Sequence, residues 1–346
     1  MHTLIIASLR NSAGKTNFAV GLAGALQKKT GYMKPFGDRL LYSKKRLWDY
    51  DAALMASLYS MQEAPDDMSI GFDHSKLRYM YDEAATRTRV TELAGNMRRD
   101  KDLLIVEAGK SLSYGTSVHL DAMSLARYLG GRLVLVISGD DDSILDDIMF
   151  VKKNVDLTGI DISGIIVNKV HNVDDFKATY LPEIARAGLR VLGVLPHQSE
   201  LTYFSLRLLA DRLFAKVLTG EANLDRTVKN IFIGAMSGNV AAQKPLFKKE
   251  DKLIITGGDR SDMILTALNH NAAGIILTNN ILPPANIISR VEESGTPMLL
   301  VTPDTYQVAR QIDRMEPLLT RQAKDKVELL KNMVKDNVDI DALMGK

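Results

Sequence analysis

Gly14, Lys15 and Thr16 follow a short apolar stretch and a polar loop near the start of the chain. A lysine and a hydroxyl group at the first turn of a helix are suited to bind phosphate and a divalent cation. The free N–H groups and the positive dipole end of the helix N-terminus also favour an anion. The stretch LIIASLRNSAGKTNFAV, residues 4–20, therefore predicts a strand, a phosphate-binding loop and a helix start.

The loop departs from the usual phosphate-binding signature at one position. That signature, G-x-x-x-x-G-K-[ST], has a Gly five residues before its second Gly, and Leu9 stands there. Arg10 follows, where one subclass of P-loop proteins has a second lysine; it either contacts phosphate or is a solvated loop charge. Lys15 is expected to reach the outer phosphates and Thr16 to bind Mg²⁺. The expected nucleotide-binding residues of the loop are Arg10, Ser12, Ala13, Gly14, Lys15 and Thr16.

Acidic residues follow two later segments and are candidate Mg²⁺ ligands, because Mg²⁺ prefers hard oxygen donors. Glu107 ends the apolar run 103–106, and ligands of parallel sheets bind beyond the carboxyl ends of the strands. It is either a metal or water-orienting group or an ordinary strand-end charge. Asp49 and Asp51 lie in LWDYDAALM, where one of them could instead cap the following helix. Asp51 is our preferred ligand.

Lys34 is a second candidate for catalysis beside Lys15. It lies in GYMKPFGDR, at the end of a predicted strand and directly before a proline. A lysine at the carboxyl end of a strand points into the same crevice as the phosphate loop. Lys34 is therefore expected to bind substrate or phosphate, and the alternative is an exposed lysine without such a role.

Composition narrows the class of protein. The chain has 346 residues, enough for two domains, and 46% of them are hydrophobic. The formal net charge of +2 gives no electrostatic reason to expect nucleic acid or a membrane surface as a partner. The count of Cys is zero, which excludes disulfides, cysteine zinc sites and cysteine nucleophiles. No apolar run approaches the roughly 20 residues of a membrane span, and we expect a cytoplasmic protein.

Short apolar runs alternate with segments of helical periodicity. Continuous rather than alternating apolar runs are typical of strands buried on both faces of a parallel sheet. The pattern predicts an α/β, doubly wound, mainly parallel fold. The predicted strands of the first half are residues 3–7, 31–34, 103–107, 133–138, 164–168 and 190–195. The predicted helices include residues 17–28, 84–99 and 143–155.

A second alternating series follows a predicted helix at residues 203–218. The first domain is expected to cover residues 1–217 and a smaller α/β domain residues 218–318, with a C-terminal helix and tail at 319–346. The strands of the second series are expected at 230–235, 252–256, 274–278 and 297–302. Its helices are expected at 261–269, 284–294 and 304–312, and the closing helix at 321–337.

The order of motifs in residues 1–215 resembles the dethiobiotin synthetase-like branch of P-loop proteins. The matching segments are SAGKT, YMKPFGD, DYDAALM, LLIVEAG, LVLVISGDD, GIIVNKV and VLGVLPHQSEL. The resemblance implies that ATP and Mg²⁺ are organised by Lys15, Thr16, Asp51 and Glu107. It also implies that Asn168 contacts adenine, that Lys34 takes the place of the lysine of the K-P segment, and that the protein is a homodimer.

Two departures from that family concern its substrate. The loop SLRNSAGKT lacks the family's Gly- and Thr-rich sequence with an acidic residue, and EAGKS replaces E-G-A-G-G. The family's amino-acid substrate is therefore not carried over. A cobyrinate-type amide synthetase shares this style of domain, but its glutaminase uses a cysteine nucleophile, which this chain lacks.

The second half resembles the so-called DRTGG domain over roughly residues 218–318, through NIFIGAMS and LIITGGDRSDMILTALNHNAAGIILTNN. This pairing of domains resembles the N-terminal, non-catalytic part of long phosphate acetyltransferases, and we expect the acetyltransferase domain to be absent. In TGGDRSD, Asp259 could pair with Arg260, and Ser261 or Asp262 could cap the next helix. Alternatively, a small anionic effector binds near Gly258, Asp259 and Arg260.

Three functions remain open at the level of sequence. The first is a Mg-ATP-binding regulatory protein whose second domain senses a ligand or carries a partner contact. The second is an ATP-dependent ligase that activates a carboxylate, with Lys15, Lys34 and Mg²⁺ stabilising charge. The third is an interaction protein with a degenerate nucleotide site, which the replacement of Gly by Leu9 motivates. We favour the first, and whether the protein is an enzyme stays open.

Overall fold

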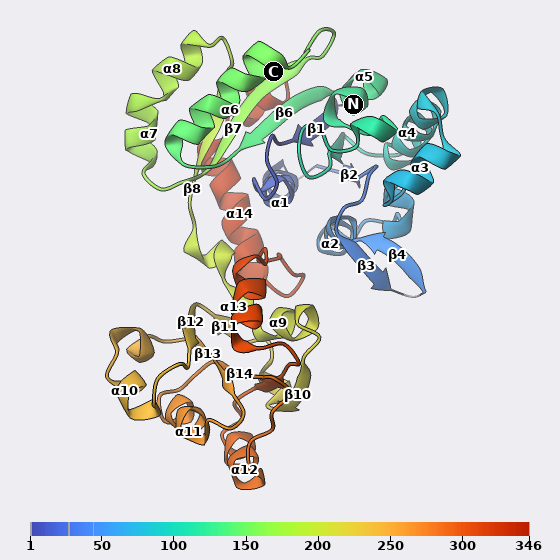
Figure 1. Cartoon of the computed structure of the whole chain (residues 1–346). Coiled ribbons are helices and arrows are strands. Elements are labelled where there is room, and N and C mark those ends of the chain that lie inside the picture. The colour runs from blue at the N-terminus through green and yellow to red at the C-terminus, as the bar shows by residue number, and fades with distance from the viewer. Residues whose placement is uncertain (1, 27, 44, 346) are drawn as a thin grey trace. The chain divides into compact units, whose positions relative to one another are not determined.

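The computed structural model describes residues 2–26, 28–43 and 45–345 (Figure 1). Residues 1, 27 and 346, which fall within predicted segments, lie outside the described residues. The chain forms two compact units, Met1–Gln198 with Leu319–Lys346, and Ser199–Leu318. Within the described residues, no helix is both long enough and apolar enough to cross a bilayer.

The first unit is built on a six-stranded sheet with the order β2-β5-β1-β6-β7-β8. Every neighbouring pair in this sheet is parallel, and flanking helices cover it (Figure 1). The inner strand β5 is buried along its whole length, as its continuous apolar run predicts. The predicted α/β class with a mainly parallel sheet is confirmed. The strands are β1 (His2–Ala7), β2 (Thr30–Met33), β5 (Leu103–Glu107), β6 (Arg132–Ile137), β7 (Ile162–Val170) and β8 (Val191–Pro196).

The helices of the first unit connect these strands. Those that bear on the candidate site are α1, which begins directly after the phosphate loop, and α2, which follows a hairpin. The helices are α1 (Lys15–Leu26), α2 (Tyr50–Leu58), α3 (His74–Met80), α4 (Glu83–Met97), α5 (Ala122–Leu129), α6 (Asp141–Asn154), α7 (Val173–Thr179), α8 (Leu181–Arg186), α14 (Lys324–Asn337) and α15 (Ile340–Leu343).

An antiparallel hairpin that the sequence did not predict lies between β2 and α2. Its strands are β3 (Leu40–Ser43) and β4 (Arg46–Asp49), and Leu40 pairs with Asp49. This register brings the two ends of the hairpin together. The residues just before β3 therefore lie beside the end of β4, where both are close to the carboxyl edge of the main sheet.

The second unit has a five-stranded sheet with the order β10-β15-β14-β13-β12. Strands β12 to β15 are parallel, and β10 is antiparallel to β15. The strands are β10 (Lys216–Thr219), β12 (Asn230–Ile233), β13 (Lys252–Gly257), β14 (Gly274–Thr278) and β15 (Met298–Leu300), with a small ladder of β9 (Phe204–Ser205) and β11 (Thr227–Val228). The helices are α9 (Leu206–Arg212), α10 (Gly238–Ala242), α11 (Ser261–Asn269), α12 (Ala285–Glu293) and α13 (Thr305–Asp313).

The predicted helix 203–218 was too long. Helix α9 ends at Arg212, Phe214 has a φ of 51°, and β10 follows. A left-handed φ at a non-Gly residue is incompatible with a continuing α-helix. Leu206 and Leu209 pack in a core with Leu253 of β13, so α9 belongs to the second unit. The units accordingly divide at residues 198 and 199, about twenty residues before the boundary expected from the sequence.

The C-terminal helix α14 returns to the first unit and packs against α1. It lies within the predicted segment 321–337. Gly21 of α1 makes the close approach possible, because a Cβ there would lie 2.5 Å from the Leu330 carbonyl oxygen and 2.7 Å from Val334 Cγ2. The core around the phosphate-loop helix therefore includes a helix from the opposite end of the chain.

Gly21→Ala should lower the unfolding free energy of the first unit by about 1–3 kcal/mol, because the added methyl group meets backbone and cannot be accommodated by a rotamer change. The measurement is urea unfolding followed by the fluorescence of Trp48, which is the single tryptophan of the chain and lies in the first unit. Gly95→Ala on α4 is the matched control. Apart from the nearby backbone of its own helix, no described atom lies within 4 Å of the added Cβ, so this substitution should raise stability by about 0.5–1 kcal/mol. Equal effects of the two substitutions would contradict the close packing of α1 and α14.

Candidate functional site

The loop between β1 and α1 curls around the start of the helix. Ser12 has a φ of 60° and Gly14 a φ of 97°, which is the region that favours glycine. A Cβ on Gly14 would lie 2.2 Å from Asn168 Nδ2. The loop is held from β7, since Asn168 Nδ2 donates to the Ala13 carbonyl at 2.9 Å and Lys169 Nζ donates to the Ser12 carbonyl at 2.7 Å. The conformation of the loop thus depends on Gly14 and on the end of β7.

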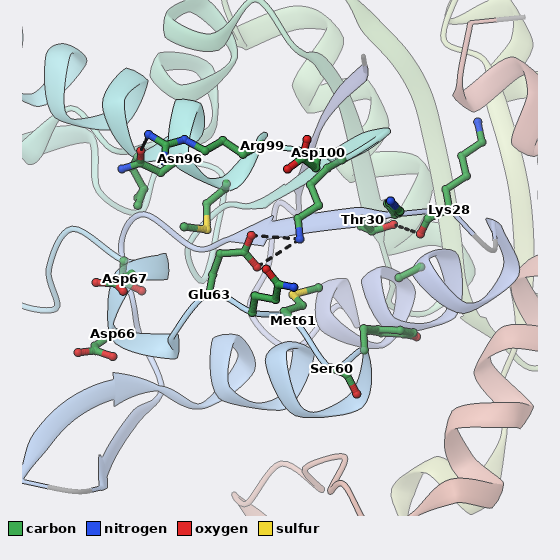
Figure 2. Close-up of a pocket in the computed structure, with 18 of the residues that line it drawn as sticks. Lys28, Thr30, Ser60, Met61, Glu63, Asp66, Asp67, Asn96, Arg99 and Asp100 are labelled. Carbon is green, nitrogen blue, oxygen red and sulfur yellow. Dashed lines mark hydrogen bonds and ion pairs between the residues drawn. The ribbon is translucent and has the colours of Figure 1, made fainter.

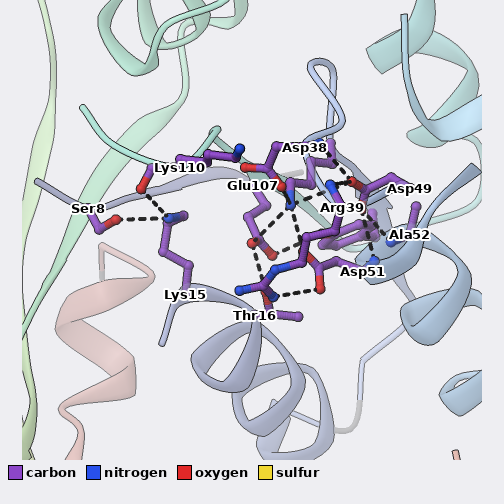
Figure 3. A network of polar contacts seen from close by, with 12 residues as sticks. Ser8, Lys15, Thr16, Asp38, Arg39, Asp49, Asp51, Ala52, Glu107 and Lys110 are labelled. Atoms are coloured by element: carbon purple, nitrogen blue, oxygen red, sulfur yellow. Dashed lines mark hydrogen bonds and ion pairs between the residues drawn. The ribbon is translucent and has the colours of Figure 1, made fainter. Parts of the chain in front are cut away.

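Lys15 and Thr16 occupy the first turn of α1, and both side chains are buried. Lys15 Nζ donates to Ser8 Oγ at 2.8 Å and to the Lys110 carbonyl at 3.3 Å (Figure 3). Burial lowers the pKa of Lys15, and the nearby Glu107 carboxylate opposes that shift. Thr16 Oγ1 donates to Glu107 Oε1 at 2.8 Å. The structure therefore joins the P-loop lysine and threonine to the acidic residue at the end of β5.

Glu107 is the buried acid at the centre of the site, with a side chain that is 2% exposed. Its Oε2 accepts a hydrogen bond from Tyr32 Oη at 2.9 Å. Burial raises the pKa of Glu107 to about 7; Asp51 adds to the rise, while Lys34 and Lys15 oppose it. The positive charge near the Glu107 carboxyl group is therefore too small to offset the effect of its burial.

Lys34 lies within a group of carboxylates and is 2% exposed. Its Nζ lies 2.5 Å from Asp38 Oδ1 and 2.6 Å from Asp51 Oδ2. Asp49 and Glu107 oxygens lie 3.6 Å and 3.9 Å from the same nitrogen. Burial lowers the pKa of Lys34, but the carboxylates outweigh it and the pKa is raised. Lys34 is therefore charged, and its ammonium group is held by the neighbouring carboxylates.

The structure separates the two acids of LWDYDAALM by role. Asp49 caps α2, because its Oδ1 accepts from the backbone N–H groups of Asp51 and Ala52. Its Oδ2 accepts from the N–H groups of Asp38 and Arg39, which ties the ends of the hairpin together. Burial raises the pKa of Asp49. The N-cap of α2 is therefore Asp49, and Asp51 remains the candidate metal ligand of the two acids.

Asp51 is 1% exposed and lies between two cations. Lys34 Nζ contacts its Oδ2, and Arg39 Nη1 contacts its Oδ1 at 3.1 Å. Burial would raise the pKa of Asp51, but Lys34 and Arg39 outweigh it and the pKa is lowered. Asp51 is thus an ionised oxygen donor close to Glu107.

The donor set of this edge fits Mg²⁺. The Thr16 hydroxyl and the Glu107 carboxyl are in direct contact, and Asp51 lies close enough to Glu107 to raise its pKa. All three offer oxygen atoms, which is the ligand type that Mg²⁺ prefers. Asp38, Asp49 and Asp51 also have oxygens within 4.8 Å of one another, but the ammonium group of Lys34 lies among them. Around Glu107 the acid has a raised pKa, and the ammonium group of Lys34 lies farther away, at 3.9 Å.

Asn168 and Arg10 contact protein groups. Besides its bond to Ala13, Asn168 accepts from the Lys169 N–H through Oδ1 at 2.9 Å. An amide side chain has two N–H donors and two lone pairs, and these two bonds use one of each. Arg10 Nη2 donates to Asp147 Oδ1 of α6 at 2.9 Å, although the Arg10 side chain is 53% exposed. Arg10 is therefore a paired charge of the loop, turned towards α6.

Several residues of the site were missed at the level of sequence. Direct contacts with the predicted residues are made by Asp38, Arg39, Tyr32, Ser8 and Lys110. Asp38 was visible in FGD, next to the Lys34 segment, and an acid four residues after a lysine is a local signal. The others carry no such signal, because their contacts depend on which strands are neighbours.

The TGGDR turn of the second unit differs from the expectation. Arg260 pairs with Asp262, and its guanidinium also donates to the carbonyls of Gly234 and Met236. The predicted cap of α11 by Ser261 or Asp262 is wrong: Arg260 is the N-cap residue, and no side chain caps the helix. The Asp262 carboxylate instead accepts from the Gly238 N–H at 2.8 Å. The polar groups of Arg260 and Asp262 therefore tie the turn to the segment 234–238.

A separate hollow of about 1290 Å³ lies in the first unit, between the end of α1, the start of β2 and α4 (Figure 2). An ion pair between Lys101 and Glu63 crosses it, at 3.1 Å. Its other charged lining residues are of both signs: Lys28, Lys29, Asp66, Asp67, Arg89, Arg99 and Asp100. None of the predicted site residues lines it, so it is distinct from the phosphate loop.

Comparison with known proteins places these features in context. A family model described as an AAA domain matches residues 2–204, and one described as a DRTGG domain matches residues 208–315. The first match covers more than half of the chain. The phosphate acetyltransferase of Pseudomonas aeruginosa is 24% identical over 376 residues, which cover 99% of this chain and 52% of that protein. The chain spans about half the length of the curated relatives it matches.

Two solved structures share partial likeness. The CBS and DRTGG domains of the regulatory region of Clostridium perfringens pyrophosphatase, complexed with the activator diadenosine tetraphosphate, match 33% of this chain and 47% of that chain. Their identity is 20% and the TM-score 0.29. Cobyrinic acid a,c-diamide synthase of Mycobacterium smegmatis matches 57% of this chain and 86% of that chain, with 12% identity and a TM-score of 0.36. Structural similarities this low support no conclusion about function.

Asp49→Ala should lower the unfolding free energy of the first unit by at least about 2 kcal/mol, because four backbone N–H groups, two of them buried and two partly buried, lose their acceptor. The measurement is again urea unfolding followed by Trp48 fluorescence. Asp82→Ala, which removes the exposed cap of α4, is the control and should cost about 1 kcal/mol. A loss for Asp49→Ala no larger than that of the control would contradict the bridging role of Asp49.

Proposed function

The chain belongs to the family of P-loop AAA domains and continues into a DRTGG domain, and from that premise we propose a Mg-ATP-binding regulatory protein. The observation that carries the proposal is the contact of Thr16 with the buried Glu107, beside Lys15 at the start of α1. A hydroxyl group, an acid and a lysine thus lie together at a helix N-terminus, which supports the proposal of an anion and a cation bound there. Such a set suits the outer phosphates of a nucleotide with its divalent cation.

In this proposal Thr16, Asp51 and Glu107 hold Mg²⁺. When bound, the ion neutralises charge on the phosphate oxygens. Arg10, Ser12, Ala13, Gly14 and Lys15 belong to the phosphate loop. Lys15 supplies a buried ammonium group to the outer phosphates, and the N–H groups at the start of α1 face the same anion.

Asn168 offers its remaining N–H and lone pair to adenine. It already fixes the Ala13 carbonyl, so one side chain would connect the base to the phosphate loop. The expected consequence is a preference for ATP over nucleotides whose base presents a different donor and acceptor pattern.

A regulatory role is favoured over catalysis by the environment of Lys34. Both of its shortest contacts are carboxylates, and the group is buried, so it is not directed at a phosphate. Phosphate acetyltransferases are relatives of this chain over about half their length. We propose that the two domains described here bind nucleotide and influence a partner activity, and we do not propose acetyl transfer for them.

The alternative is an ATP-dependent ligase that activates a carboxylate. The observation that favours it is the presence of further cationic residues at the site: Arg39 Nη1 lies 3.1 Å from Asp51 Oδ1, and the backbone of Lys110 contacts Lys15. Such groups could hold an anionic acceptor. Release of phosphate from ATP only in the presence of one metabolite, from a panel of carboxylates, would favour the ligase over the regulatory protein.

Three further expectations stay predictions. A small anionic effector near Gly258, Asp259 and Arg260 would have to compete with the carbonyls and the carboxylate that already hold the Arg260 guanidinium. The homodimer is testable by light scattering across a concentration series. The cytoplasmic location is testable by cell fractionation.

Mg-ATP at 100 times its dissociation constant should stabilise the first unit by about 2.7 kcal/mol. The measurement is a thermal shift with Mg-ATP, Mg-ADP, ATP with EDTA, and buffer. Lys15→Ala should abolish the shift, because it removes the ammonium group at the start of α1. Glu107→Gln should reduce the difference between ATP with Mg²⁺ and ATP with EDTA.

Lys153→Ala, an exposed lysine in the last turn of α6, is the control and should keep the full shift. A shift that survives Lys15→Ala would move nucleotide binding away from the loop. The absence of any shift at millimolar nucleotide would refute the proposed function.

A further inference from the structure

Lys110 is a lysine of the site that neither motif nor family resemblance assigns. It follows β5 by three residues, in the segment EAGKS. Its carbonyl oxygen accepts from Lys15 Nζ at 3.3 Å, so its backbone borders the lysine expected to reach the outer phosphates (Figure 3). The side chain of Lys110 therefore starts within the phosphate site.

The segment that carries Lys110 is fixed by aromatic packing. The Tyr114 ring stacks on Phe36 at 4.9 Å and 24°, and His74 packs edge-on against both rings. Phe36 follows Lys34 by two residues, so this packing links the segment after β5 to the end of β2. The position of Lys110 relative to Lys15 and Lys34 thus has a structural support.

The charge of Lys110 is available to a ligand. The residue is exposed, and its Nζ lies 5.5 Å from the centre of the Tyr114 ring. A cation that meets an aromatic face at an exposed position is held weakly. In the described part of the chain no carboxylate forms an ion pair with Lys110. The ammonium group can leave the ring without breaking a salt bridge.

Lys34 has the opposite character. Its ammonium contacts Asp38 and Asp51 at 2.5 Å and 2.6 Å, and it is 2% exposed. A phosphate could draw Lys34 away only by leaving those buried carboxylates without a counter-charge, which is strongly unfavourable. The lysine expected from the K-P segment to bind phosphate is therefore the less available of the two.

We propose that Lys110 contacts the terminal phosphate of the bound nucleotide and takes the role expected of Lys34. This inference rests on the proposed nucleotide site. The terminal phosphate carries more negative charge than an inner one, and a lysine on a flexible four-carbon stem meets it as a point charge. Removing the charge should therefore weaken a triphosphate and leave a diphosphate almost unchanged.

The test is isothermal titration of the full chain with Mg²⁺ and either AMPPNP or ADP. Lys110→Met, which keeps most of the stem and removes the charge, should weaken AMPPNP binding about five- to twentyfold and change ADP binding by less than about twofold. Lys110→Arg should retain the preference for the triphosphate, since it keeps the charge. Lys153→Met is the matched control and should bind both ligands as the unmodified protein does.

Three outcomes would overturn the inference. An unchanged ratio of AMPPNP to ADP affinity in Lys110→Met would show that Lys110 does not contact the terminal phosphate. Equal weakening of both ligands would show a general effect of charge or of the segment's conformation. An unmodified protein that binds neither ligand would refute the proposed function itself and this inference with it, whereas the first two outcomes leave nucleotide binding intact.

Discussion

The contact of the buried Lys34 ammonium with its carboxylate neighbours is the interaction on which the site depends. It gathers Asp38, Asp51 and Glu107 from three segments around one charge. Buried carboxylates this close repel one another, and only a counter-charge makes their burial tolerable. Lys34 thereby keeps Asp51 ionised, while Glu107, farther from that ammonium, keeps a raised pKa. The remaining deficit of positive charge lies beside Thr16, which is where a divalent cation is proposed.

Much of the fold follows from the sequence because the strands of the main sheet are buried on both faces. Their apolar runs are continuous, and β5 is fully buried. The β3–β4 hairpin was missed because one of its faces is exposed and carries Leu40 and Tyr42, at 55% and 73% exposure. The pattern of apolar residues in a sequence cannot predict a strand whose apolar side chains are exposed. The helix before β10 was overextended because the left-handed turn at Phe214 leaves no mark in residue type.

Residues of the candidate site could be predicted where they lie within a sequence motif. Lys15 and Thr16 follow from the loop, and Glu107 from the end of an apolar strand that neighbours β1. The choice between Asp49 and Asp51 needed the structure, because the cap at Asp49 depends on the hairpin ends meeting. The pairing of Arg10 with Asp147 joins residues 137 positions apart. No spacing rule reaches that distance, and tertiary packing decides it.

The connectivity gives the proposed regulation a physical basis. The second unit is inserted into the first, since the chain leaves after β8 and returns as α14. The departing strand β8 pairs with β7, whose Asn168 holds the phosphate loop. The returning helix packs on α1, which carries Lys15 and Thr16, through the close approach at Gly21. Both covalent connections of the second unit thus lead to elements that fix the phosphate loop. A protein whose second domain responds to nucleotide binding in the first domain requires such connections to the phosphate loop. A protein that only catalyses a reaction in its first domain does not require them.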